Sequence, residues 1–309
     1  MNNLVSPLTS SKFVRLLKED LREVSEDAFN DLPKQGEKYY RNIDSSSATE
    51  EFFDVSGLPD IPEFNGKLSY IGQAPGYHTK IEPKEFAAGV QTERKFVDDN
   101  KWSVLRNHAT GLVKALGRTR EKYRARPFNY AFSSAFDFMQ SEEGLSLCNS
   151  SHTTKSGTST ANGFDNAGTD ALSKTSVAAT WLAMRGFRDT ISERIDMDDS
   201  FALIVPDALG DAAEEIVGTK KGLNTAEGNV NPQEGRYMVE RYMRLDDYDT
   251  NNWFMVNWTL MKMFLVWIDR VDSDPNTTID FETFAVKHSI YSRFGYGWLD
   301  WRWVFGHQV

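Results

Sequence analysis

The chain has very little cysteine and no long apolar run, and both shortages narrow its class. Its 309 residues include one cysteine, Cys148, so no disulfide can form within the chain, and this usage fits a reducing compartment. The longest uninterrupted apolar stretch, Met263 to Ile268, is far shorter than the roughly 20 residues of a membrane-spanning helix. The first residues lack the charged and apolar blocks of a secretory signal. We therefore expect no membrane partner.

Motifs of catalysis and cofactor binding are also missing. The sequence has no phosphate-binding glycine loop, no nucleophile elbow and no paired-histidine metal motif. Cys148 and His152 are four residues apart, but two potential ligands in a segment rich in serine and glycine do not make a zinc site. Asp246, Asp247 and Asp249 lack the glycine and distal glutamate of a calcium loop, so they favour a polar turn between strands. We expect no catalytic, cofactor-binding or metal-binding residue.

Positive charge is in short supply overall. The formal net charge of −10 argues against a general nucleic-acid binder, although local basic patches are compatible with such a balance. The composition, 40% apolar and 26% charged, is ordinary for a soluble protein. The length allows a large core and two domains.

The chain's most extended helical pattern runs from Asp98 to Arg126. Asp98 and Asp99 are candidate N-cap residues, and Pro127 is expected to end the helix because proline has no amide hydrogen. An apolar seam recurs at helical spacing: Trp102, Leu105, Ala109, Leu112, Leu116 and Tyr123. His108 lies within a turn of this seam and is most simply a packing or capping residue.

The other faces of this helix are basic. They carry Lys101, Arg106, Lys114, Arg118, Arg120, Lys122, Arg124 and Arg126. Lys114, Arg118 and Lys122 are four residues apart and so share one helix face. They are a candidate patch for packaged nucleic acid or for an acidic neighbour, and the simpler alternative is a solvated face.

The remaining pattern mixes helices and strands. We expect helices at 11–29, 129–139 and 170–186, the last capped by Thr169 or Asp170 with Leu172, Ala179 and Leu182 on its buried face, and another at 207–217. We expect hairpin strands within 50–96, a buried strand at 201–206 and further strands at 237–243, 253–258 and 263–268. Polar segments predict an extended arm at 31–49, loops at 145–168 and 220–235, and a turn at 272–276. The alternation of aromatics changes phase between Trp298 and Trp301, which indicates a turn or bulge.

In their order, these parts resemble the major capsid proteins of tailed double-stranded DNA bacteriophages, with the Hong Kong 97-type fold, and most of all the Mu-like major head subunits. The resemblance extends from about Phe86 to the C-terminus. It rests on Gly89–Arg94 leading into Asp98-Asp99, on Glu143–Cys148 with His152, on the segments 172–188 and 203–216, and on Arg293–Arg302.

The resemblance implies an α+β fold in five parts. These are an N-terminal arm at 1–48, an extended hairpin called the E-loop at 49–95, a peripheral (P) domain with a long spine helix at 96–144, an axial (A) domain at 145–261, and return strands to the P domain at 262–309. The implied function is a self-assembling shell of pentamers and hexamers around phage DNA.

The same resemblance implies partners and a location. The subunit would contact copies of itself, a portal protein, the packaged DNA without sequence preference, and in some relatives a decoration protein. Because the first helix begins within a dozen residues of the start, we expect any scaffolding to come from a separate protein. The subunit would be assembled in the cytoplasm of the host bacterium and would end in the virion.

Two other classes of protein are also compatible with the sequence. An encapsulin-like compartment would use the same fold to enclose cargo enzymes. A cytosolic enzyme would place loops around a cleft near His152 and Asp246. Particle size separates a shell from a small enzyme, and the contents separate the two kinds of shell.

Overall fold

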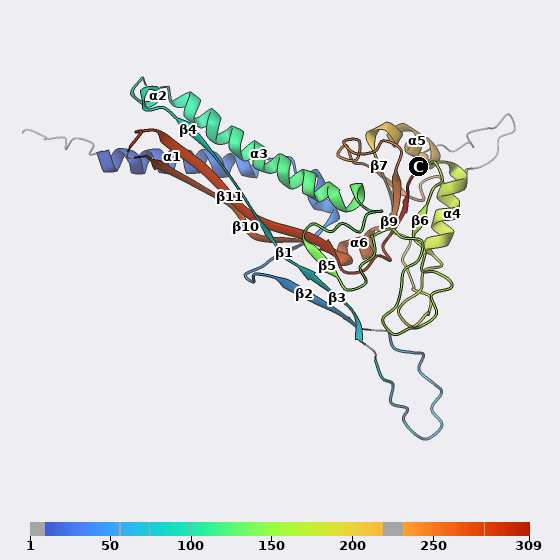
Figure 1. Ribbon diagram of the computed structural model, residues 1–309. Coiled ribbons are helices and arrows are strands. Elements are labelled where there is room, and N and C mark those ends of the chain that lie inside the picture. The colour runs from blue at the N-terminus through green and yellow to red at the C-terminus, as the bar shows by residue number, and fades with distance from the viewer. Residues whose placement is uncertain (1–9, 56, 74, 100, 219–230, 281) are drawn as a thin grey trace, which may run out of the picture. The chain divides into compact units, whose positions relative to one another are not determined.

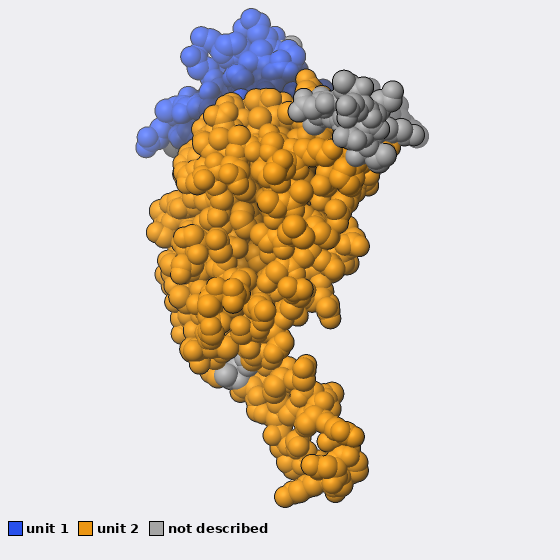
Figure 2. Space-filling view, turned by 90° about the vertical axis from the view of Figure 1, so that its right-hand side faces the viewer, with its two compact units in different colours: residues 1–34, 83–122, 269–294 blue, residues 35–82, 123–268, 295–309 orange. Residues whose placement is uncertain are grey.

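The computed structural model describes residues 10–55, 57–73, 75–99, 101–218, 231–280 and 282–309, arranged as two compact units. Unit 1 comprises Met1–Lys34, Pro83–Lys122 and Asp269–Phe294, and unit 2 comprises Gln35–Glu82, Tyr123–Ile268 and Gly295–Val309. Figure 2 colours the two units separately. Most of the loop expected at 220–235 lies outside the described residues.

Unit 1 combines three helical segments with most of a four-stranded sheet (Figure 1). Its helices are α1 (Ser10–Asn30), the short α2 (Arg94–Asp98) and most of α3 (Trp102–Asn129). The sheet has the order β1-β10-β11-β4, with bounds Arg41–Asp44, Leu265–Ile279, Val286–Trp298 and Lys84–Thr92. Of these, β4 and most of β10 and β11 belong to unit 1, and β1 belongs to unit 2. β11 pairs with β4 antiparallel, from Val286 opposite Thr92 to Phe294 opposite Lys84. The helix predicted at 11–29 is confirmed.

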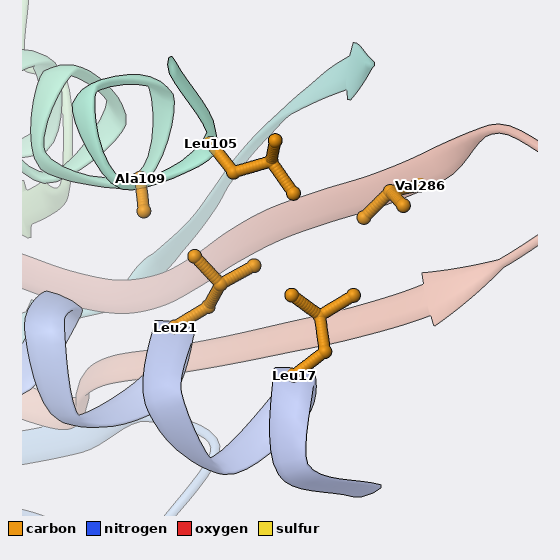
Figure 3. Packing of buried hydrophobic residues seen from close by; sticks show 5 residues of the cluster. All are labelled: Leu17, Leu21, Leu105, Ala109 and Val286. Atoms are coloured by element: carbon orange, nitrogen blue, oxygen red, sulfur yellow. The ribbon is translucent and has the colours of Figure 1, made fainter. Parts of the chain in front are cut away.

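The core of unit 1 lies between the helices and the sheet. Leu17 and Leu21 of α1 point toward Leu105 and Ala109 of α3 and Val286 of β11 (Figure 3), and all five are buried. Burying a leucine side chain stabilises a fold by about 1.5–3 kcal/mol. The seam predicted for the long helix therefore does face the core at Leu105 and Ala109.

Both predicted ends of that helix are wrong. α2 ends at Asp98 and α3 begins at Trp102, so Asp98 and Asp99 do not cap it. Pro127 lies inside α3, which continues to Asn129. A proline this close to the C-terminal end removes a single helical hydrogen bond. Phe128, only 1% exposed and in ring contact with Phe254 and Trp303, gives the last turn tertiary packing that outweighs this loss.

Unit 2 is organised around a five-stranded sheet of order β6-β12-β9-β7-β8. These strands span Ala167–Gly168, Val304–His307, Trp253–Asn257, Phe201–Val205 and Met238–Arg241. All residues of β7 and β9 are buried, as the continuous apolar run of β7 predicts. Helix α5 (Asp207–Gly218) contacts β7 and β8, and α4 (Lys174–Met184) contacts β9 and β12.

A second, three-stranded sheet of unit 2 carries the predicted hairpin. Its order is β2-β3-β5, with bounds Glu50–Val55, Pro75–Ile81 and Met139–Ser141. β2 and β3 are antiparallel, and Val55 pairs with Pro75 at their far end. The following strand, β4, leaves the hairpin and pairs with β11 instead.

The segment 31–49, expected to be an extended arm, is partly folded. It contains a 3-10 helix, η1 (Gln35–Tyr39), and β1. Tyr39 and Tyr40 are fully buried, and the Tyr40 hydroxyl donates a hydrogen bond of 2.6 Å to the Arg124 carbonyl. Two large aromatic side chains therefore tie this segment to unit 2.

Other expectations are wrong for local reasons. Residues 130–138 form no helix, because the Ser133 hydroxyl accepts a hydrogen bond from the Ala135 amide and so favours a turn. The helix expected at 170–186 is α4, but Ser173 is its N-cap, and its buried residues are Ser176, Val177, Thr180 and Met184. Leu182 is 64% exposed. The strand expected at 263–268 begins at Leu265, after helix α6 (Trp258–Phe264).

The turn expected at 272–276 is also wrong, because these residues continue β10. Asp272, Asp274 and Asn276 are exposed, while the residues between them are half-buried, which is the alternation of a strand. Proline is tolerated where its missing amide faces an open sheet edge. β1 has four residues against fifteen in β10, so most of that edge has no partner strand within the described ranges.

His307 in β12 is held as a neutral imidazole. Its ring stacks on Trp253 at 4.1 Å. The Asp170 amide donates to Nδ1 at 3.2 Å. Nε2 lies 2.8 Å from the Thr180 hydroxyl, which itself donates to the Ser176 carbonyl, so Nε2 carries the proton. Burial lowers the pKa of His307 to about 4, against a smaller opposing effect of Asp170.

We therefore expect acid to destabilise unit 2 through His307. The unfolded chain takes up this proton near pH 6.5, whereas the folded chain resists it until about pH 4. Stability should fall across that window as the pH falls, by on the order of 1–3 kcal/mol. His307→Gln keeps a donor and an acceptor without titrating. Urea unfolding at pH 7 and pH 4.5 should show a smaller loss for this variant than for the wild type, and equal losses would contradict the assignment.

Candidate functional surfaces

The predicted basic patch lies on the solvent side of α3. Lys114, Arg118 and Lys122 are all exposed. Within the described part of the chain, none of the three has an ion-pair partner. Their charges are therefore available to an anionic ligand.

Arg120, by contrast, is buried on another side of the same helix. At about 100° per residue it lies roughly 200° around the helix from Lys122. Its guanidinium makes two hydrogen bonds to the Asp269 carboxylate, at 2.8 and 2.9 Å, and an ion pair with Asp272 at 2.9 Å. Its charge also lies 5.3 Å from the centre of the Phe294 ring. Arg120 is 5% exposed and serves the core of unit 1.

Two further arginines of α3, Arg124 and Arg126, also have interaction partners, and these lie in unit 2. Arg124, 3% exposed, lies 3.5 Å from a Glu37 oxygen and 4.8 Å from the centre of the Trp267 ring. Arg126 pairs with Asp137. The helix thus separates structural arginines from a face of exposed cations, a division that periodicity alone did not reveal.

The loop between β2 and β3 is exposed and apolar. Every residue from Leu58 to Tyr70 is exposed. Five large apolar side chains on it are 57–94% exposed: Leu58, Ile61, Phe64, Leu68 and Tyr70. The loop forms the narrow lobe of unit 2 in Figure 2 and extends away from β2 and β3 in Figure 1. It has no core of its own.

The base of this loop is fixed, in contrast to its tip. The Gly57 amide donates to the Thr190 hydroxyl at 3.1 Å, and a Cβ at Gly57 would lie 2.3 Å from a carboxylate oxygen of Asp189, so a larger residue would require that side chain to move. On β3, Tyr77 bonds to Thr153 at 2.8 Å. Glu142 binds Lys155 and His78, and these hydrogen bonds lower the pKa of its carboxyl group to about 2.

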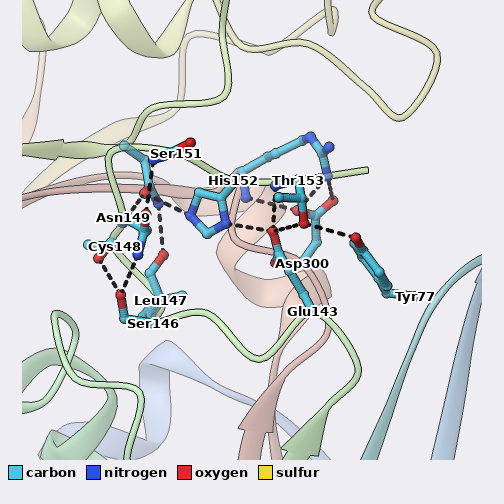
Figure 4. A network of polar contacts seen from close by, with 12 residues as sticks. Tyr77, Glu143, Ser146, Leu147, Cys148, Asn149, Ser151, His152, Thr153 and Asp300 are labelled. Atoms are coloured by element: carbon cyan, nitrogen blue, oxygen red, sulfur yellow. Dashed lines mark hydrogen bonds and ion pairs between the residues drawn. The ribbon is translucent and has the colours of Figure 1, made fainter. Parts of the chain in front are cut away.

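His152 holds the long loop 145–168 in place (Figure 4). Its Nδ1 lies 3.0 Å from a Glu143 oxygen and its Nε2 lies 3.0 Å from the Asn166 side-chain oxygen. The Asn166 amide group in turn donates to the Leu147 and Val304 carbonyls. The His152 ring also stacks on Trp301 at 4.0 Å. The loop has little regular structure, as expected, but these bonds hold residues toward both of its ends.

Cys148 and Asp246, the other candidates for a catalytic role, are held in contacts that stabilise the fold. Cys148 is 2% exposed, and burial raises the pKa of its thiol, which disfavours the nucleophilic thiolate. The Asp246 carboxylate accepts hydrogen bonds from the Asp207 and Ala208 amides, so it caps the start of α5 from a distant turn. No hydrogen bond joins His152 to Asp246 within the residues the structure describes.

The remaining candidates behave likewise. Asp247 pairs with Arg244, and Asp249 accepts from the Asn251 amide, in the turns between β8 and β9. His108 is exposed and bonds to the Thr92 hydroxyl at 3.0 Å. Across the described ranges, no three His, Cys, Asp or Glu side chains are grouped to hold a metal ion.

Solved structures with a similar fold include several capsids. The capsid of a native GTA particle aligns over 90% of this chain and 92% of its own, with a TM-score of 0.54 and 10% identity. The capsid of Ralstonia phage GP4 aligns over 88% and 86%, with a TM-score of 0.53 and 9% identity. The capsid of cyanophage P-SCSP1u aligns over 87% and 85%, with a TM-score of 0.52 and 13% identity. At these identities the likeness establishes the fold.

Sequence comparison supplies the family. No curated protein sequence shows significant similarity to the chain. None of the described helices is long and apolar enough to cross a membrane. The family model for phage capsid protein matches residues 76–306, well over half of the chain. Together with the α+β fold shared with those capsids, this match shows that the chain belongs to the phage capsid protein family and is a major capsid shell protein of the Hong Kong 97-type fold.

Proposed function

We propose that the chain assembles as homopentamers and homohexamers into an icosahedral shell around phage double-stranded DNA. The observation that carries the proposal is the loop from Leu58 to Tyr70, whose large apolar side chains are not covered by any other described residue of the subunit. Exposed apolar patches of this kind mark contact sites in soluble proteins. We infer that a neighbouring copy covers the loop, which would then be the E-loop of the family.

The five-part division of the chain is part of this proposal. The parts are the arm at 1–48, the E-loop at 49–95, the P domain at 96–144, the A domain at 145–261 and the return strands at 262–309. The hairpin of β2 and β3 supports the E-loop, and the 28-residue α3 supports a spine helix. Membership of the Mu-like branch remains a prediction.

The family implies that the protein is a virion component. We propose that assembly takes place in the cytoplasm of a host bacterium, with a portal protein and a separate scaffolding protein as partners and a decoration protein as an optional one. Structural contacts at Cys148, His152 and Asp246 support a building role without catalysis. An encapsulin-like compartment would differ in contents, with cargo proteins in place of DNA.

The direct test is to produce the chain alone and with candidate scaffolding proteins from the same genome. Light scattering and negative-stain electron microscopy should reveal closed particles, because subunit contacts of this kind bury well over about 1,000 Å². A chain that stays monomeric under every condition would contradict the proposal. Nucleic acid in particles purified from infected cells would exclude the cargo compartment.

We further propose that Lys114, Arg118 and Lys122 contact packaged DNA. Phosphate contacts are independent of sequence and weaken with salt, because binding releases condensed counterions. Changing all three to glutamine removes the charges and keeps the helix propensity. We expect the same yield of empty shells, but loss of the genome at a lower salt concentration than in the wild type. DNA content after incubation across a salt series measures the effect.

A matched control removes three other cations of unit 1. Arg22, Lys95 and Lys287 are paired with Glu26, Glu93 and Asp280, so their change to glutamine alters the net charge equally. Retention should then resemble the wild type. Equal loss in both triple variants would indicate a general charge effect, and failed assembly of the first variant alone would place the patch at a subunit contact.

A further inference from the structure

The outer edge of β4 is long and lacks the features that usually prevent an edge strand from pairing with another strand. β4 is the last strand of its sheet, so in the described part of the chain one edge has no partner strand. Its nine residues follow β11 in an unbroken register without a bulge. Between Phe86 and Thr92 there is no charged residue and no proline. Charges, prolines, bulges or short length normally stop an edge from recruiting another strand.

The middle of β4 is also open on both faces. Ala87 and Ala88 point to opposite faces of the sheet, and both are exposed, as is Gly89. On β11, Ile290 lies opposite Ala88 and is buried, so the cover over this face does not extend to β4. A further strand could therefore join the sheet here without displacing a side chain.

We propose that β4 pairs antiparallel with β4 of a second copy of the chain, about a two-fold axis at Ala88. Ala88 is the midpoint of Lys84–Thr92, so this register pairs all nine residues of each strand. Lys84 then faces Thr92 and Glu85 faces Gln91, and no like charges meet. Phe86 faces Val90 on the face that carries Ala88, which gives the apolar cross-strand pairs that stabilise sheets.

A second copy is the occupant that the strand itself favours. A two-fold contact uses the same patch on both partners, so the patch must be complementary to itself. The charges and sizes along β4 meet that condition in the register centred on Ala88. The contact deepens the proposed self-assembly and rests on it, because assembly brings copies of the subunit together.

Disulfide trapping tests this contact. In an antiparallel pair, opposite Cα atoms are about 4.5 or 5.5 Å apart, within disulfide range. Ala88→Cys should thus form, in oxidised shells, a dimer on denaturing gels that a reducing agent removes. Native Cys148 is buried and should not compete. Ser289→Cys is the control, since Ser289 is exposed on β11 opposite Gly89 and lies three strand spacings, at least about 14 Å, from its mate.

Hydrogen exchange on the wild type gives an independent measurement, should Ala88→Cys fail to assemble. The amides of Ala87 to Gln91 that point away from β11 should exchange slowly in shells and fast in free subunits. Unchanged exchange would overturn the proposal. A third outcome is slow exchange in wild-type shells together with an assembled Ala88→Cys variant that forms no disulfide-linked dimer. It would show that another segment covers the edge of β4, and it would also overturn the proposal. Absence of shells from the wild type would instead contradict the proposed function, and with it this contact.

Discussion

Replacing Leu58–Gln73 by a short glycine-rich turn should abolish shell formation and leave a folded subunit. The loop contributes no buried residue between Leu58 and Tyr70, so its removal takes nothing from either core. Val55 already pairs with Pro75 across the hairpin, and about two to four residues can close such a hairpin. The large apolar side chains would be lost from the surface, and with them the contact to a neighbour.

Two measurements separate folding from assembly in this variant. The thermal midpoint of the free subunit should stay close to that of the wild type, because surface loops tolerate change. Sedimentation or microscopy should show no closed particles. A milder control replaces Lys67 and Asn65 by alanine, which keeps the apolar residues. Closed particles from the shortened chain would show that the loop is not the subunit contact.

Asp269→Ala should be among the most destabilising single changes in unit 1. Arg120 is only 5% exposed. The change would remove the carboxylate that accepts two hydrogen bonds from its guanidinium group. Breaking a buried ion pair from one side costs about 3–5 kcal/mol. We expect a value near 3 kcal/mol, at the lower end, because Asp272 still offers a carboxylate to Arg120. Urea unfolding of the free subunit measures it.

Two control variants make this prediction specific. Asp20→Ala breaks another arginine–aspartate pair, between Arg106 of α3 and Asp20 of α1, but the two side chains are 55% and 34% exposed, so little change is expected. The double change Arg120→Met and Asp269→Leu removes both charges together. It should be more stable than Asp269→Ala, because no charge is left buried without its partner. If all three variants unfold alike, the buried pair has no special role.

The pattern of apolar residues predicted secondary structure most accurately for elements that pack against a core. The seam of α3 through Leu105 and Ala109, the buried strand β7 and the helix α1 follow from spacing alone. The order of parts supplied the capsid resemblance, since no single motif is specific. The exposed loop was also predictable, because its turn-forming residues separate apolar ones too sparse to form a core.

Several of the failures share a physical cause, since they depend on contacts distant in sequence. α4 buries Ser176 and Thr180 because Thr180 meets His307, 127 residues away. Residues 272–276, rich in Asp and Pro, form part of strand β10 because every second side chain can face solvent when the segment pairs within the sheet. Likewise, no local signal marks Arg120 as buried and Lys122 as exposed. Arg120 is buried because its ion-pair partners Asp269 and Asp272 lie on that side of the helix.

The segment order of unit 1 has a consequence for synthesis on the ribosome. Its core joins Leu17 and Leu21 near the start of the chain to Val286 near the end. At roughly 5–20 residues per second, the 309-residue chain takes about 15–60 s to make. For most of that time the first helix has no sheet to pack on. A nascent chain therefore lacks both a finished unit 1 and the strand β11 that sets the register of β4. Subunits can therefore meet as folded units only after β11 has been synthesised, which delays association until residues 286–298 are in place.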